Sequence, residues 1–348
     1  TTGANNTALG YLALDANTTA NNNTAIGYAA LGANTTGAGN VAIGAQALEN
    51  ATTADYNTAI GLQALDTCTT GANNTAVGFY AAYSLTTGTK NTALGQSALE
   101  GCTDGTNNVA IGYETGTADW GDANVAVGYR ALKVNTASTN VAVGKEAMVS
   151  NTTGTNNVAV GGQALDANTT GSYLVAVGYN ALTANTTGHR NTAVGTDALL
   201  SNTTGAYNSA FGQDAMGLNT TGAHNTAVGN NALNAANGGD DCTAIGHNAY
   251  ANGTSGEDNT VVGSHAMDAV VTGNHNCAFG HASLSNLTSG YNNSCYGRTS
   301  GFAMLNGHNN TFLGYDAGFS DTSGSYNIFA GSGAGMYETT SNLSLIHI

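Results

Sequence analysis

The sequence contains no proline and little charge, with only 6 lysines and arginines against 21 aspartates and glutamates among its 348 residues. The resulting formal net charge of −15 leaves no basic face of the kind that binds nucleic acid or an anionic membrane. Aromatic residues make up only 7%, and no apolar run approaches the ~20 residues of a membrane-spanning helix. We therefore expect no nucleic-acid partner and no membrane span in this chain.

The two ends of the sequence indicate a fragment of a longer protein. The chain opens on Thr-Thr-Gly in the middle of a repeated pattern, and residues 343–348 break the preceding composition. The segment 343–348 is similar to an in-frame translation of an adaptor used in sequencing libraries. We expect residues 1–342 to form one continuous repeat array and residues 343–348 to be an adaptor scar.

Glycine recurs with a fixed period along the whole chain. The glycine of Asn-Thr-Ala-Leu-Gly10 has twenty counterparts, itself included, up to Gly331, spaced by 17 residues with two intervals of 16. Relative to this glycine, the unit has Asn at −4, Thr or Val at −3, Ala at −2, an aliphatic residue at −1, Ala at +3, Leu or Met at +4, and then Asn-Thr-Thr-Gly. No charged residue occurs at positions −4 to 0, +3 or +4. The pattern predicts an all-β, single-chain parallel β-solenoid of about twenty 17-residue coils.

Alternation along a strand divides the unit into two faces. Because positions −3 and −1 carry the larger apolar side chains, we expect them to face the core, joined there by the leucine at +4. The alanine at −2 then forms an outward stripe of small residues. Such a stripe suits close approach of a second copy, which predicts a homo-oligomer, most simply a homotrimer. The alternative is that alanine merely tolerates a tight coil.

Two motifs resemble known repeats. Asn-Val-Ala-Ile-Gly at residues 40–44 and 108–112 resembles the head repeats of trimeric autotransporter adhesins of the YadA type. Gly-Tyr-Ala-Ala-Leu at 27–31 and Asn-Thr-Thr-Gly at 34–37 are similar to phage tail-fibre shaft repeats. The resemblance covers residues 3–337, although this period is longer than the usual head repeat. It implies a left-handed β-roll, a homotrimer or fibre, and an extracellular location on a cell surface or virion.

The function implied by this resemblance is structural or adhesive. The chain would be a segment of an extracellular fibre or adhesin head that displays a repetitive surface to a host, a glycan or an extracellular matrix ligand. The alternatives are a phage tail-fibre shaft and an ice-binding solenoid, since regular coils present arrays of threonine. Adjacent threonines point to opposite faces, so each coil offers only one outward threonine. No nucleophile, base and orienting group recur together, so we expect no enzyme and no cofactor.

Aromatic residues at position +1 are the candidate ligand contacts, because exposed rings suit sugar faces or an apolar patch of a partner. The alternative is a tolerant surface, since +1 also carries Gln96 and Lys145. Trp120 joins the candidates because it lies in a coil shortened to 16 residues. The candidate contacts are Tyr11, Tyr28, Phe79, Tyr113, Trp120, Tyr129 and Tyr179.

Asparagine-based glycosylation sequons recur in the expected outer loop. Turn composition explains the same residues without any glycan. The candidate acceptors are Asn17, Asn34, Asn151, Asn168, Asn185, Asn202 and Asn219.

The remaining polar residues favour structural interpretations. Asparagine at −4 predicts a ladder of stacked amides. The five cysteines lack the spacing of a disulfide framework and are interpreted as fillers, with interchain pairing of Cys295 across the alanine stripe as the alternative. The acidic pairs at 240–241 and 257–258 are interpreted as solvated loops, with a calcium site as the alternative. We expect no metal site.

Overall fold

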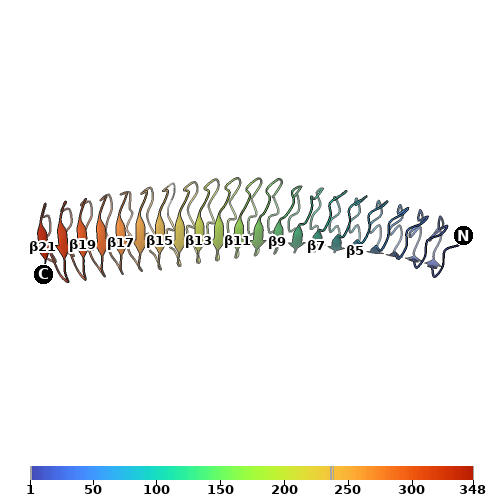
Figure 1. Ribbon diagram of the computed structural model, residues 1–348, viewed down its shortest axis with the longest axis horizontal. Helices are drawn as coiled ribbons and strands as arrows, with labels where there is room; N and C mark the ends of the chain where they lie inside the picture. Colours follow the sequence, from blue (N-terminus) through green and yellow to red (C-terminus); the bar gives the residue numbers. More distant parts are fainter. Residues whose placement is uncertain (1, 236, 238, 348) are drawn as a thin grey trace. The chain divides into compact units, whose positions relative to one another are not determined.

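A computed structural model describes residues 2–235, 237 and 239–347. The chain divides into two compact units, Thr1–Tyr173 and Leu174–Ile348, each described separately below. Figure 1 shows that each turn of the chain contains one short strand. The described residues contain strands and turns but no helix.

Every strand has three residues and occupies positions −3 to −1 of its repeat. The first unit contains β1 (Thr7–Leu9), β2 (Thr24–Ile26), β3 (Val41–Ile43), β4 (Thr58–Ile60), β5 (Thr75–Val77), β6 (Thr92–Leu94), β7 (Val109–Ile111), β8 (Val125–Val127), β9 (Val141–Val143) and β10 (Val158–Val160). The second unit contains β11 (Val175–Val177), β12 (Thr192–Val194), β13 (Ser209–Phe211), β14 (Thr226–Val228), β15 (Thr243–Ile245), β16 (Thr260–Val262), β17 (Cys277–Phe279), β18 (Ser294–Tyr296), β19 (Thr311–Leu313), β20 (Ile328–Ala330) and β21 (Leu345–His347).

Consecutive strands within each unit pair in parallel and in register. Residues of β2 pair with their counterparts in β3, such as Ala25 with Ala42, and β12 pairs with β13 in the same way. The predicted parallel β-solenoid, with one coil per repeat, is therefore confirmed. The segment expected to be an adaptor scar also continues the pattern, because β21 pairs in parallel with β20.

The predicted orientation of the strands is wrong. The alanines at −2, such as Ala42 and Ala59, are fully buried, whereas Leu94 at −1 remains 46% exposed. The interior lies between the strand and the segment at +3 and +4, where Ala47 and Leu48 are also fully buried. Because a large side chain at +4 fills most of this narrow space, the facing strand position is usually alanine, although Val261 is also fully buried in the coil that carries Met267 at +4. The alanine stripe therefore belongs to the core and forms no outward surface.

Two consecutive coils with a larger residue at −2 show how this space is shared. Phe312 and Phe329 occupy −2 in their coils, and both are fully buried. The same coils carry Gly318 and Gly335 at +4, in place of leucine. A Cβ at Gly318 would lie 2.6 Å from the Phe312 ring, and one at Gly335 would lie 2.6 Å from the Phe329 ring. The side-chain volume in the core of these coils is thus maintained, but the residue at −2 supplies it in place of the leucine at +4.

The anchor glycine closes the corner after each strand. Gly44 has φ 138°, and a Cβ added there would lie 2.4 Å from the carbonyl oxygen of Gly61 in the next coil. Both the backbone conformation and the close stacking therefore require glycine. Left-handed backbone also occurs at residues that are not glycine, at +2, +4 and −5, as in Gln46, Leu48 and Tyr56.

A buried ladder of asparagines at −4 supports the corner opposite the leucines. The N–H of Asn40 donates to Oδ1 of Asn23 at 2.8 Å, and Oδ1 of Asn40 accepts the N–H of Asn57 at 2.9 Å. Nδ2 of Asn40 donates to the carbonyl of Ala54 at 2.7 Å. The predicted amide stacking is confirmed, and it satisfies backbone groups that would otherwise be buried without partners.

The volume exchange between −2 and +4 can be tested in the C-terminal coils. Phe312→Ala leaves a cavity, since Gly318 does not fill the space, and we expect a loss of about 3–5 kcal/mol in the free energy of unfolding. Adding Gly318→Leu recreates the alanine and leucine of an ordinary coil and should recover most of the loss. Guanidinium unfolding measures both variants. Equal stability of Phe312→Ala and the double variant would contradict the exchange.

Candidate functional site

The outward strand face of each unit is its most continuous apolar surface. We use this term for the side chains at −3 and −1, which carry no charged residue in any of the twenty coils. In the first unit the exposed members at −1 include Leu9, Ile60, Leu94 and Val160, and in the second unit Phe211, Ile245, Tyr296 and Leu313. Each face is therefore a strip of uncharged side chains on a parallel sheet, aliphatic residues and threonines in the first unit and aromatic rings as well in the second.

The aromatic residues predicted at +1 lie on the surface, as expected. Tyr11 and Tyr28 stack with ring centroids 5.9 Å apart and are 72% and 53% exposed. Tyr113 and Tyr129 stack in the same way at 5.7 Å. The remaining exposed rings at this position are Phe79 in the first unit and Tyr179 and Tyr315 in the second. Stacking on consecutive coils builds small flat platforms of the kind that contact apolar faces of ligands.

An ion-pair network holds one of these platforms. Glu114 binds Lys133 at 2.7 Å and the Nε of Arg130 at 2.8 Å, while the Arg130 guanidinium lies 5.0 Å from the Tyr129 ring centroid. The hydrogen bond from Lys133, followed by those from Tyr113 and Arg130, lowers the pKa of Glu114 to about 2. The carboxylate therefore stays charged, and the network intact, well below its ordinary pKa of 4.5.

Trp120, predicted as an exposed contact, is instead buried in the core with 1% of its surface exposed. Its Nε1 donates to the carbonyl of Leu132 at 3.1 Å. The shortened coil carries Gly116 at +4, and a Cβ there would lie 2.5 Å from the indole ring. Trp120 thus fills the space that a leucine fills elsewhere. The missing leucine at 116 was the sequence signal for this role.

The asparagines proposed as glycan acceptors are mostly inaccessible in the folded chain. Nδ2 of Asn151 donates to Oδ1 of Asn135 at 2.7 Å, and Nδ2 of Asn202 donates to Oδ1 of Asn185 at 2.9 Å. The prediction of an exposed loop position is therefore wrong, because the nitrogen that would carry a glycan lies inside a second amide ladder. The fully buried members are Asn34, Asn151, Asn168, Asn185, Asn202 and Asn219, whereas Asn17 is half-buried.

The two threonines that follow each of these asparagines have different environments. Oγ1 of Thr35 donates to the carbonyl of Thr52 in the next coil at 3.0 Å, and Thr36 is exposed. Thr52 and Thr53 repeat the arrangement. One threonine of each of these pairs is committed to coil stacking, as predicted. The expectation of only one outward threonine per coil is wrong, because threonines at −3, such as Thr58 and Thr75, also lie on the outward strand face. Ice binding stays a prediction.

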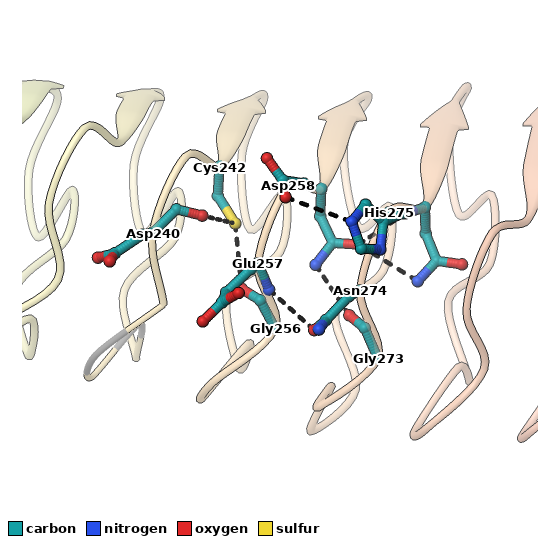
Figure 2. Close-up of polar contacts among 10 residues, drawn as sticks. Asp240, Cys242, Gly256, Glu257, Asp258, Gly273, Asn274 and His275 are labelled. Atoms are coloured by element: carbon teal, nitrogen blue, oxygen red, sulfur yellow. Dashed lines mark hydrogen bonds and ion pairs between the residues drawn. The ribbon is translucent and has the colours of Figure 1, made fainter.

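The acidic residues near β15 and β16 contribute to coil stacking. Oδ1 of Asp240 accepts the N–H of Ala223 at 2.7 Å, and Oδ2 of Asp258 lies 3.4 Å from Nε2 of His275. Figure 2 shows Asp258 reaching toward His275, while Asp240 points away from both. Within the described residues, no group of three or more His, Cys, Asp or Glu side chains is arranged to hold a metal ion.

Four of the five cysteines are buried, and Cys277 at −3 is half-buried. Cys295 occupies −2 and is fully enclosed, so the alternative of interchain pairing at this residue is wrong. Burial raises the pKa of Cys68 and Cys242 to about 11 and that of Cys102 to about 12, and it raises that of Cys295 as well. These thiols are core fillers that stay protonated at neutral pH.

Comparisons with known proteins provide no identification. No protein-family model matches the chain, and no curated protein matches it significantly. Among the described residues, no helix is long and apolar enough to cross a membrane.

Thiol labelling tests the buried positions. In the Cys277→Ser variant we expect no rapid reaction with a disulfide reagent from pH 7 to about 9, because a raised pKa keeps the buried thiols protonated until the pH approaches that pKa. Guanidinium should then release all four remaining thiols. Spectroscopic titration with the reagent provides the count, and a rapid phase in the folded variant would contradict the placement of the core.

Proposed function

We propose that this protein is a structural and adhesive segment of an extracellular fibre or adhesin head, which self-associates through its outward strand faces. The observation that carries this proposal is the uncharged, partly exposed row of aliphatic side chains at −1. In the first unit, ten strands spaced ~4.8 Å apart and about 10 Å long present a strip of roughly 400 Å². The largest apolar patch of a typical soluble monomer is about 300–600 Å² and is often functional, so a strip of this size is a candidate interaction surface.

A second copy of this chain is the partner that best suits such a strip. The face carries no charge, so electrostatic attraction does not select a partner for it. Association therefore relies on apolar contact and shape. The face also repeats every coil, so two copies can align many equivalent contacts at once. Identical patches on identical chains favour closed symmetric assemblies. The homotrimer implied by the repeat resemblance is the arrangement that we propose.

The adhesive part of the proposal depends on the other surfaces of the coil. Tyr11 with Tyr28, and Tyr113 with Tyr129, offer exposed platforms suited to a glycan or a matrix protein. Self-association through the strand face leaves position +1 on a different part of the coil. Repetition multiplies weak contacts, which increases avidity without any single strong site. An extracellular location, on a cell surface or a virion, fits this use.

Charge substitution on the strand face tests self-association. Ile60 and Leu94, both exposed at −1, are replaced by glutamate in one variant. Sedimentation equilibrium should show the parent as a discrete oligomer and this variant shifted strongly toward the monomer, because glutamate cannot be buried there without a partner. The matched control is Thr53→Glu with Thr87→Glu, since these threonines are exposed on another part of the coil.

Circular dichroism confirms that each variant keeps its strand signal. A monomeric parent at micromolar concentration would contradict the proposal, as would equal dissociation in the control variant.

A further inference from the structure

A hollow of about 400 Å³ opens on the surface of the second unit, away from the outward strand face. It lies between two consecutive loops, one preceding β17 and the other preceding β18. The first loop contributes Thr272, Asn274 and His275, and the second contributes Ser289, Tyr291 and Asn292. Its volume is near the lower end of the ~300–1,000 Å³ typical of small-molecule sites.

Tyr291 forms the aromatic wall of this hollow, and only one of its faces is covered by another ring. The ring of His308 in the next coil stacks on it, with centroids 4.8 Å apart and an interplanar angle of 13°. On the other side the preceding coil offers Asn274, whose side chain is not aromatic. Tyr291 is 44% exposed and lines the hollow.

Tyr207 lies in an equivalent loop, one position closer to its anchor glycine than Tyr291, and has aromatic rings on both sides. The ring of His189 lies against it at 5.3 Å and that of His224 at 4.9 Å, from the preceding and the following coils. The Arg190 guanidinium adds a further contact 5.2 Å from the ring centroid. Tyr291, by contrast, has a ring on one side and the non-aromatic Asn274 on the other, and both residues line the hollow.

Hydrogen-bonding groups surround the open ring. Oδ1 of Asn274 accepts the N–H of Glu257 at 3.0 Å, which directs its Nδ2 donors elsewhere (Figure 2). Nδ2 of Asn292 donates to Oδ1 of Asn309 at 3.2 Å, which leaves its own Oδ1 as an acceptor. Ser289 adds a hydroxyl that both donates and accepts. An aromatic face bordered by amides and hydroxyls is complementary to a sugar ring, with polarised C–H groups on one side and hydroxyls at its edge.

From this geometry we propose that the hollow binds a neutral pyranose. Asp258 and Glu257 lie beside His275 and Asn274, so the local field disfavours a sugar that carries a carboxylate. The inference rests on the adhesive function proposed above and specifies one ligand class for it. The site uses none of the residues tested for self-association.

Saturation-transfer difference NMR tests the site with methyl glycosides of glucose, galactose and mannose at millimolar concentration, and with methyl glucuronide as the anionic probe. We expect saturable transfer to at least one neutral glycoside and much weaker transfer to the glucuronide. Tyr291→Ala should weaken binding about tenfold, because the stacking face is lost. Asn274→Tyr should also abolish binding, since a ring at 274 would close the hollow and extend the stack. Tyr207→Ala is the matched control and should bind as the parent does.

Absence of saturable transfer to all three neutral glycosides would overturn the proposal, as would equal binding by the Tyr291→Ala and Tyr207→Ala variants. Sedimentation of the same variants separates this result from the proposed function. Failure of sugar binding with an intact oligomer rejects only the hollow, whereas a monomeric parent that binds sugar rejects only self-association.

Discussion

Within each unit the strands stack in register on their counterparts in the neighbouring coils, and the rest of the structure depends on this stacking. A side chain must therefore tolerate a near-copy of itself about 4.8 Å away. Buried charge fails that condition, which accounts for its absence from positions −4 to 0, +3 and +4. Asparagine meets it, because one amide both donates and accepts: Nδ2 of Asn57 donates to the carbonyl of Gly71, and its Oδ1 accepts the N–H of Asn74. Aromatic rings meet it by stacking.

Much of the coil could be predicted from the period and residue types alone. The strand position, the parallel pairing, the glycine corner, the buried leucine at +4 and the asparagine ladder all follow from one repeated unit. Alternation also separates −2 from −3 and −1, but it does not say which face is inside. Hydrophobicity favours the larger aliphatics, whereas the width of the coil admits only Ala42 opposite Leu48. Size, and not hydrophobicity, decides the orientation.

The candidate site, too, could be predicted only in part from the sequence. Exposure of Tyr11 and Tyr28 could be predicted because their neighbours at +1 are variable and polar. The burial of Trp120 and of the sequon asparagines could not be predicted from local composition. Trp120 fills a core volume that a leucine fills elsewhere, and the asparagines bond to amides of the adjacent coil. The open face of Tyr291 likewise depends on a residue 17 positions earlier. Comparing equivalent positions in successive repeats therefore carries information that a single segment does not.

The reversed orientation also changes the basis of the functional proposal. An alanine stripe would offer little area to a partner, whereas the outward aliphatic row offers a continuous apolar strip. The most direct test compares aspartate at two adjacent residues of β5, Ala76 and Val77. Guanidinium unfolding should show a loss of several kcal/mol for Ala76→Asp, about 3–5 by the cost of an unpaired buried charge, and a much smaller loss for Val77→Asp. The opposite order would place the aliphatic residues inside and contradict the account.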